Sequence, residues 1–252
     1  GNIAAANIAI DYNIQGPSFT VSTACSSGGD AINTACMCMQ SGKADIMLAV
    51  GAESVLCPLV IYSLANAKAL SRRNDSPSTA SRPFDVTRDG FVIGEGGGAL
   101  VLETEEHALA RGAKIYAEIR GCGNTDDAYH VTAPHPEGRG AIACMKQAIA
   151  EAGINPSDIG YINAHGTATN KGDTVETSSI KKGFGNTLPY VSSTKGATGH
   201  MMGAGGITET ITCVKAIETG TVPPTINLNE VDPECAGIDF VANTAKKAEI
   251  NF

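Results

Sequence analysis

An α/β fold with largely parallel sheets is predicted from three features of the sequence. Short apolar stretches of strand length alternate with longer stretches that have helical periodicity. Short loops rich in Gly, Pro and Asn separate them. Two expected helices are rich in Ala, Gly, Thr and Cys, and such small side chains suit helices buried on most sides between sheets. Repeated units of strand, loop and helix favour parallel pairing of the strands.

Helices are expected where apolar residues recur at helical spacing and a turn signal follows. Gly42 and Gly153 each stand just beyond such a stretch, where a left-handed glycine commonly ends a helix. The expected helices span residues 3–12, 27–41, 105–111, 138–153, 173–184 and 203–218.

Strands are expected in the short apolar stretches between these helices. They span residues 18–22, 45–50, 99–103, 113–121, 159–164 and 190–193. A glycine-rich stretch, residues 90–98, precedes one of them. It leads into a strand instead of a helix and lacks the Lys-Ser/Thr of a phosphate loop, so a turn or close sheet packing is expected there.

Composition excludes several classes of protein. With 252 residues, 42% hydrophobic and 17% charged, the chain is long and apolar enough for a sizeable core. The net charge of −8 argues against a broad nucleic-acid surface, so any acidic partner must meet a local basic patch. No apolar run approaches the roughly 18 residues of a membrane span, and no leader segment is recognised.

The eight cysteines are scattered along the chain and do not have the spacing of a disulfide framework. No Cys-x-x-Cys or His-x-x-x-His pair occurs, so no metal site is expected. A reducing compartment is the expected setting.

One cysteine stands in a different context. Cys25 lies between an expected strand and an expected helix, among the small residues of Ala24-Cys-Ser-Ser-Gly-Gly29. Such residues leave a sulfur accessible and permit a tight strand-to-helix turn, as in a nucleophile elbow. A helix N-terminus can lower a thiol pKa from about 8.5 toward 3.5–7.5. The sequence thus offers Cys25 as a nucleophile, with an ordinary buried cysteine as the alternative.

Two histidines have the position that partners of a nucleophile need. His165 and His200 each follow an expected strand and are flanked by Gly and Thr. Functional side chains of α/β proteins gather at the carboxyl ends of strands.

Together these motifs resemble the β-ketoacyl-[acyl-carrier-protein] synthases, most closely the elongating type II. The matching residues are Thr23-Ala-Cys25-Ser-Ser, Asn163-Ala-His165-Gly-Thr-Ala-Thr169, Ser193-Thr-Lys195-Gly-Ala-Thr-Gly-His200, Arg82-Pro-Phe-Asp85, Arg88-Asp-Gly-Phe-Val92 and Val222-Pro-Pro-Thr-Ile-Asn227. The resemblance implies a thiolase-like fold with five alternating layers, α-β-α-β-α, built from two similar halves. Residues 1–111 would be what remains of the N-terminal half, and residues 112–252 the C-terminal half.

The resemblance also implies a decarboxylative Claisen condensation. Cys25 would accept the acyl chain as a thioester. His165 and His200, as neutral imidazoles donating Nε2–H, would bind the malonyl carbonyl and stabilise the enolate. Each preorganised donor of this kind is worth on the order of 10²–10³ in rate. Lys195 would give electrostatic support, with Glu209 as its ion-pair partner.

Substrate and partner contacts are implied in the same way. Thr132, Thr167 and Thr169 would hydrogen-bond the pantetheine arm. Lys68 and Arg72 would contact an acidic acyl carrier protein. A homodimer formed through the strand before the nucleophile is implied, with no cofactor, in the bacterial cytosol or an organelle.

The chain also departs from the family pattern. It is shorter and lacks the glycine- and phenylalanine-rich loop expected after Phe252, which would supply a gating Phe and a second oxyanion N–H. A piece of a larger synthase is therefore expected.

Other functions remain open. A polyketide ketosynthase is the near alternative, although such enzymes usually carry an acidic residue where Thr23 stands. The others are a non-catalytic subunit or incomplete fragment and a cysteine hydrolase.

Overall fold

The computed structural model describes residues 1–252. The chain divides into two compact units, which are described separately. The first comprises Gly1–Ser54, Gly96–Tyr116 and Met201–Ile211, and the second comprises Val55–Glu95, Ala117–His200 and Thr212–Phe252. No helix is long and apolar enough to cross a membrane.

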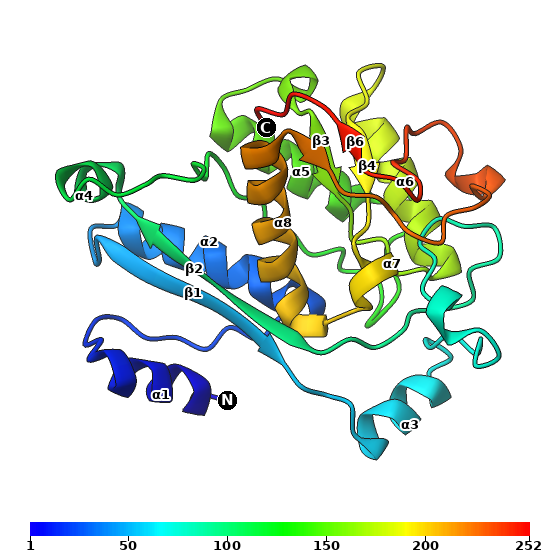
Figure 1. Cartoon of the computed structure of the whole chain (residues 1–252), viewed down its shortest axis with the longest axis horizontal. Helices are drawn as coiled ribbons and strands as arrows, with labels where there is room; N and C mark the ends of the chain where they lie inside the picture. The colour runs from blue at the N-terminus through cyan, green and yellow to red at the C-terminus, as the bar shows by residue number, and fades with distance from the viewer. The chain divides into compact units, whose positions relative to one another are not determined.

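The first unit contains three complete α-helices, the beginning of a fourth and one antiparallel pair of strands (Figure 1). Its elements are α1 (Ile3–Tyr12), α2 (Ser27–Gln40), β1 (Ile46–Glu53), β2 (Gly96–Glu103) and α4 (Glu105–Ala110). Strands β1 and β2 pair antiparallel along their whole length, from Ile46 opposite Glu103 to Glu53 opposite Gly96. Helix α8 (Gly205–Thr219) begins in this unit and ends in the second.

The glycine-rich stretch lets α8 lie directly on β1 and β2. A Cβ atom at Gly51 or at Gly98 would come within 2.9 Å of the Ile207 side chain. The helices also meet closely, since a Cβ at Gly28 would lie 2.7 Å from the Ile207 nitrogen and one at Gly206 would lie 2.5 Å from the Gly29 nitrogen. The expectation of close packing at the glycine-rich stretch is confirmed. The core here is formed by Ile32, Ala35, Ala49 and Ile207.

The second unit contains the remaining elements. They are α3 (Pro58–Asn66), α5 (Arg139–Ala152), β3 (Tyr161–Asn163), α6 (Asn170–Phe184), β4 (Tyr190–Ser192), α7 (Lys195–Thr198), β5 (Thr221–Val222) and β6 (Lys246–Lys247). Strands β3 and β4 pair parallel, while β5 and β6 pair antiparallel.

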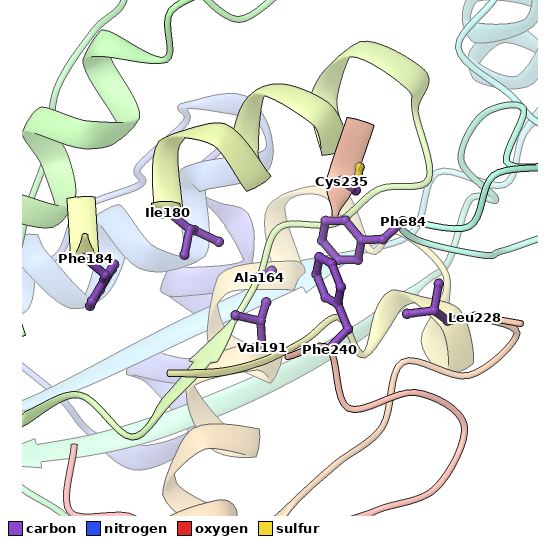
Figure 2. Close-up of a cluster of buried hydrophobic side chains, with 8 residues drawn as sticks. All are labelled: Phe84, Ala164, Ile180, Phe184, Val191, Leu228, Cys235 and Phe240. Atoms are coloured by element: carbon purple, nitrogen blue, oxygen red, sulfur yellow. The ribbon is translucent and has the colours of Figure 1, made fainter. Parts of the chain in front are cut away.

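An aromatic stack lies in the main core of the second unit. The rings of Phe84 and Phe240 stack with centroids 4.3 Å apart (Figure 2). Ala164, at the end of β3, and Val191, in β4, are buried in the same cluster. This core therefore supports the two strands whose carboxyl ends carry the histidine motifs.

Three strand expectations were wrong. The sheets are not largely parallel, because β1 pairs antiparallel with β2. Residues 18–22 and 113–121 form no strand. A strand exists only where a second segment supplies hydrogen-bonding partners, and side-chain pattern carries no information about that partner. All six predicted helices form, with α6 beginning at Asn170 instead of residue 173.

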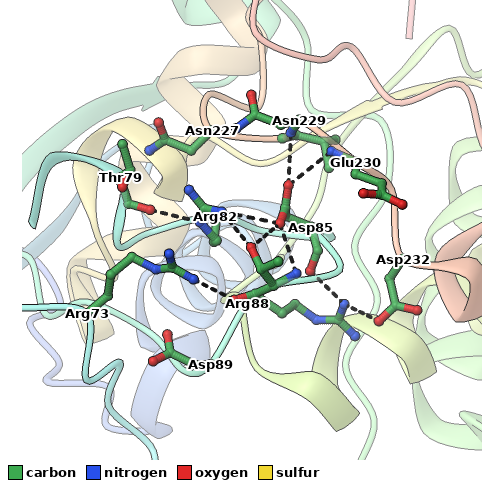
Figure 3. Close-up of polar contacts among 12 residues, drawn as sticks. Arg73, Thr79, Arg82, Asp85, Arg88, Asp89, Asn227, Asn229, Glu230 and Asp232 are labelled. Atoms are coloured by element: carbon green, nitrogen blue, oxygen red, sulfur yellow. Dashed lines mark hydrogen bonds and ion pairs between the residues drawn. The ribbon is translucent and has the colours of Figure 1, made fainter. Parts of the chain in front are cut away.

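The Arg-Pro-Phe-Asp and Arg-Asp-Gly-Phe motifs build a buried polar network in the second unit (Figure 3). Asp85 is 1% exposed and accepts hydrogen bonds from Thr87, from the Asn229 nitrogen at 2.9 Å and from the Glu230 nitrogen at 3.1 Å. Burial by itself raises the pKa of Asp85, but these hydrogen bonds outweigh it and hold the pKa below 3.8.

Arg88 extends the network to α6. Its Nη1 atom lies 2.6 Å from Asp232, and its Nε atom lies 3.5 Å from Asp173. The guanidinium also donates to the backbone oxygen of Asn170, where α6 begins. The start of α6 is thereby fixed to the loop that carries the Arg-Asp-Gly-Phe motif.

Replacing Asp85 by Asn is expected to lower the free energy of unfolding by about 2–4 kcal/mol, because it leaves buried donors without a carboxylate. Folding lowers the pKa of Asp85, so its contribution is present above 3.8 and is lost as the pH falls below that value. Urea denaturation at pH 7 measures the loss. The exposed Asp11→Asn control should change stability by less than about 0.5 kcal/mol, and an equal effect of both changes would contradict the prediction.

Candidate active site

Cys25 lies at a strained turn in the first unit. Ala24 has a left-handed backbone with φ of +52°, which is uncommon for a residue that has a Cβ. A short 3₁₀ helix, Ala24–Ser26, leads directly into α2. The expected sharp turn is present, although an irregular segment precedes it instead of a strand. Cys25 is half-buried and lies directly before the N-terminus of α2.

Hydrogen bonds on both sides of Cys25 hold this turn. Asp30 accepts from the Thr23 hydroxyl at 2.5 Å and from the Ser26 hydroxyl at 2.9 Å. Ser27 accepts from the Thr23 nitrogen and donates to the Ala24 oxygen. Asp30 was not predicted as a site residue, although the first turn of a helix is a usual position for an acidic residue that makes such contacts.

His165 lies in the second unit, on the loop that follows β3. The Glu176 carboxylate of α6 accepts the N–H groups of His165 and Gly166, each at 2.7 Å. Asp173, one turn earlier on α6, accepts from the Thr167 nitrogen at 3.1 Å. Two carboxylates of one helix therefore fix the histidine loop by its backbone.

These two carboxylates were also missed from the sequence. Asp173 and Glu176 are three residues apart, which places them on one face of a helix. The helix that carries them follows the His165 motif directly in the sequence. The three-residue spacing between the two acidic residues is the signal that identifies them.

His200 is fixed by backbone pairing with a second motif. Its nitrogen donates to the Val92 oxygen at 2.7 Å, and its oxygen accepts from the Gly94 nitrogen at 2.9 Å. The Phe91 ring meets the imidazole edge-on, with centroids 5.2 Å apart. The rings of His165 and His200 are 5.3 Å apart and nearly perpendicular at 89°. The second unit thus brings both predicted histidines together.

Desolvation and the neighbouring Lys195 charge keep these rings neutral. It is 2% exposed and begins α7. Desolvation, and then the Lys195 charge, lower the pKa of His200 to about 4. Desolvation, Lys195 and His200 together lower the pKa of His165 well below 6.5, although its side chain keeps access to solvent. At pH 7 each ring carries one N–H donor and no charge.

The other predicted residues have varied surroundings. Thr167 and Thr169 lie next to each other, with hydroxyl oxygens 3.1 Å apart, on the loop after His165. Thr132 is exposed, and its nitrogen donates to His130. Lys68 and Arg72 are exposed. Glu209 belongs to the first unit and Lys195 to the second, so their pairing stays a prediction.

The chain is similar to known β-ketoacyl synthases along its length. The family models for the "Beta-ketoacyl synthase" N-terminal and C-terminal domains match residues 1–108 and 116–229. The 3-oxoacyl-[acyl-carrier-protein] synthase 2 of Rhizobium meliloti is 47% identical over 99% of this chain and 60% of the relative. A mitochondrial 3-oxoacyl-[acyl-carrier-protein] synthase of Arabidopsis thaliana is 46% identical over 92% of this chain and 51% of the relative.

Solved structures agree with these matches. The ketosynthase in a complex of a type II polyketide synthase acyl-carrier protein aligns with a TM-score of 0.95 and 39% identity, covering 98% of this chain and 61% of that chain. A β-ketoacyl synthase from Burkholderia phymatum aligns with a TM-score of 0.92 and 39% identity, covering 98% and 59%.

The predicted thiolase-like fold is confirmed by these structures. The chain spans 60% of the length of the Rhizobium meliloti relative and 51% of the length of the Arabidopsis thaliana relative. With both domain models matched and the motifs in place, the chain belongs to the β-ketoacyl synthase family.

Proposed function

We propose that this chain carries the catalytic residues of a 3-oxoacyl-[acyl-carrier-protein] synthase that elongates fatty acids. The observation that carries the proposal is the perpendicular pair of neutral imidazoles, His165 and His200, beside a buried lysine. Relatives named 3-oxoacyl-[acyl-carrier-protein] synthase 2 support the substrate class. The division into halves at residues 1–111 and 112–252 is part of the same proposal.

The first reaction loads the nucleophile. The Cys25 thiolate attacks the carbonyl carbon of an acyl thioester, and the carrier leaves as a thiolate, which takes a proton from solvent. The acyl group is then held as a thioester on Cys25. A helix N-terminus stabilises the thiolate.

The second reaction forms the carbon–carbon bond. The malonyl thioester loses its carboxyl group as carbon dioxide, and the bonding electrons pass to the adjacent carbon and carbonyl oxygen. The Nε2–H groups of His165 and His200 donate to this enolate oxygen. The enolate carbon attacks the acyl carbonyl, and the Cys25 thiolate leaves. Fixed donors are effective here because they need no reorganisation when the charge develops.

Lys195 supports this step through its charge and does not transfer a proton. It stabilises the developing enolate and opposes protonation of both rings. Glu209 would balance the lysine charge. Thr132, Thr167 and Thr169 would hydrogen-bond the amides of the pantetheine arm.

The proposal includes the partners and the setting of the protein. An acidic acyl carrier protein would dock on Lys68 and Arg72. A homodimer would form through the segment before Cys25, where Phe19 is 54% exposed and Ile14 is 46% exposed. We place the protein in the bacterial cytosol, with an organelle as the alternative.

A polyketide ketosynthase is the second candidate. The TM-score of 0.95 to the ketosynthase of a type II polyketide synthase favours it. The acyl group that is loaded on Cys25 distinguishes the two functions. A fatty acid synthase takes a saturated acyl group, whereas a polyketide synthase takes a chain that keeps its ketones.

Mixing the chain with an acyl-carrier-protein thioester should add one acyl group to Cys25. Intact-protein mass measures the increment, and digestion with peptide mapping places it. Cys25→Ala should abolish the increment, whereas Cys57→Ala, which removes an exposed cysteine, should keep it. A folded chain without any increment would show that Cys25 needs more of the synthase than these 252 residues.

His200 should stay neutral between pH 7 and pH 5, because its pKa is about 4, and the pKa of His165 should be found well below 6.5. Folding lowers both pKa values, so protonation opposes folding and stability falls as the pH drops from 6.5 toward 4. A ring-selective NMR titration measures both groups. A midpoint near 6.5 for His200 would contradict this account.

Reversing the charge of the predicted carrier surface should slow loading. The double change Lys68→Glu and Arg72→Glu should reduce acyl transfer from the carrier protein about 10-fold, since electrostatic steering changes association rates by about 10–10³. Transfer from a small acyl thioester without a carrier should stay unchanged. The exposed Lys43→Glu control should behave like the unmodified chain, and equal slowing by this control would count against the surface.

A further inference from the structure

Two neighbouring serines at the end of β4 have different partners. Ser192 and Ser193 are both fully buried at 0% exposure. The Ser192 hydroxyl lies 2.9 Å from the Tyr161 hydroxyl, within the core. The Ser193 hydroxyl instead donates to the backbone oxygen of Gly166 at 2.7 Å and accepts from the backbone nitrogen of Lys195 at 3.3 Å.

The Ser193 contacts join the two segments that carry the histidines. Gly166 directly follows His165, and Lys195 begins the helix that leads to His200. The Gly166 backbone has φ of +33°, and a Cβ atom there would lie 2.5 Å from the Ser193 Cβ. The His165 loop is therefore pressed against Ser193 as well as hydrogen-bonded to it.

A second buried hydroxyl fixes Ser193. The Ser193 nitrogen donates to the Thr225 hydroxyl at 2.8 Å, and Thr225 is 0% exposed. The Thr225 nitrogen in turn donates to the Val241 oxygen at 2.7 Å. This series of hydrogen bonds runs from the core to the His165 loop without any solvent-exposed member among Thr225, Ser193 and Gly166.

We propose that Ser193, supported by Thr225, is a positioning residue that holds the His165 loop and the Lys195–His200 segment in register. It touches neither substrate nor reacting atoms and acts through the two imidazoles. Its catalytic meaning rests on the proposed function. Misplacing a catalytic group by about 1 Å can cost about 10² in rate, so a hydroxyl that fixes two donors affects turnover more than binding.

The adjacent serine provides a matched control. Ser193→Ala and Ser192→Ala each remove one buried hydroxyl at the end of β4, so both should lower the melting temperature. Only Ser193→Ala should lower kcat for decarboxylation of malonyl thioester, by about 10- to 100-fold with KM within about 2-fold. Ser192→Ala should stay within about 2-fold in kcat. Equal losses of kcat in both variants would overturn the proposal.

A second pair of variants applies if Ser193→Ala does not fold. Thr225→Val keeps the shape and removes the hydroxyl, whereas Thr225→Ser keeps the hydroxyl. The proposal predicts the same kcat loss in Thr225→Val and its recovery in Thr225→Ser. An unchanged kcat in Thr225→Val, or an equal loss of kcat in Thr225→Ser, would overturn the proposal.

An NMR measurement separates this proposal from the proposed function. Loosening of the His165 loop weakens the hydrogen bonds of its backbone to Glu176, so the His165 and Gly166 amides should exchange with solvent faster in Ser193→Ala and at an unchanged rate in Ser192→Ala. This readout needs no activity. An unmodified chain that decarboxylates nothing would defeat the proposed function, while the NMR comparison would still decide the role of Ser193. Unchanged exchange of the His165 and Gly166 amides in Ser193→Ala would reject that role.

Discussion

A buried positive charge beside two imidazoles is the constraint on which the rest of the site depends. Lys195 is 2% exposed, and its charge and the surrounding desolvation both oppose protonation of His200 and His165. A neutral imidazole keeps one N–H donor and can stabilise an oxyanion without giving up its proton. The two rings can stabilise an oxyanion only while both stay neutral and keep their positions. The Lys195 charge and the hydrogen bonds that hold the two loops are therefore both needed.

The scaffold that keeps them in place is mostly backbone hydrogen bonding. Glu176 and Asp173 hold the His165 loop from α6, and Arg88 ties the start of α6 to the motif loops. Buried ionic groups add little net stability when compared with apolar side chains of the same volume, but they impose one arrangement. In this chain Arg88 and Asp173 serve geometry in this way, because they fix the start of α6 and the backbone of the His165 loop.

Much of the fold and site is predictable from the sequence, and the failures have a common physical cause. Helical periodicity located six helices because a helix satisfies its own backbone. Cys25, His165 and His200 were found because each follows an apolar stretch and has small neighbours. Residues 113–121 were misassigned because strand formation depends on a distant partner. Glu176 was not predicted because its role consists of contacts with a loop that only folding brings to it. The role of Ser193 depends on a contact of the same kind, so its motif was recognised without that role.

The most direct test of the central claim is the release of labelled carbon dioxide from a malonyl thioester. In the proposed mechanism the histidines stabilise the enolate and Cys25 takes no part in decarboxylation. Carbon dioxide release should therefore continue in Cys25→Ala and fall by about 10² or more in His165→Ala and in His200→Ala. Release that depends on Cys25 and is indifferent to both histidines would contradict the account.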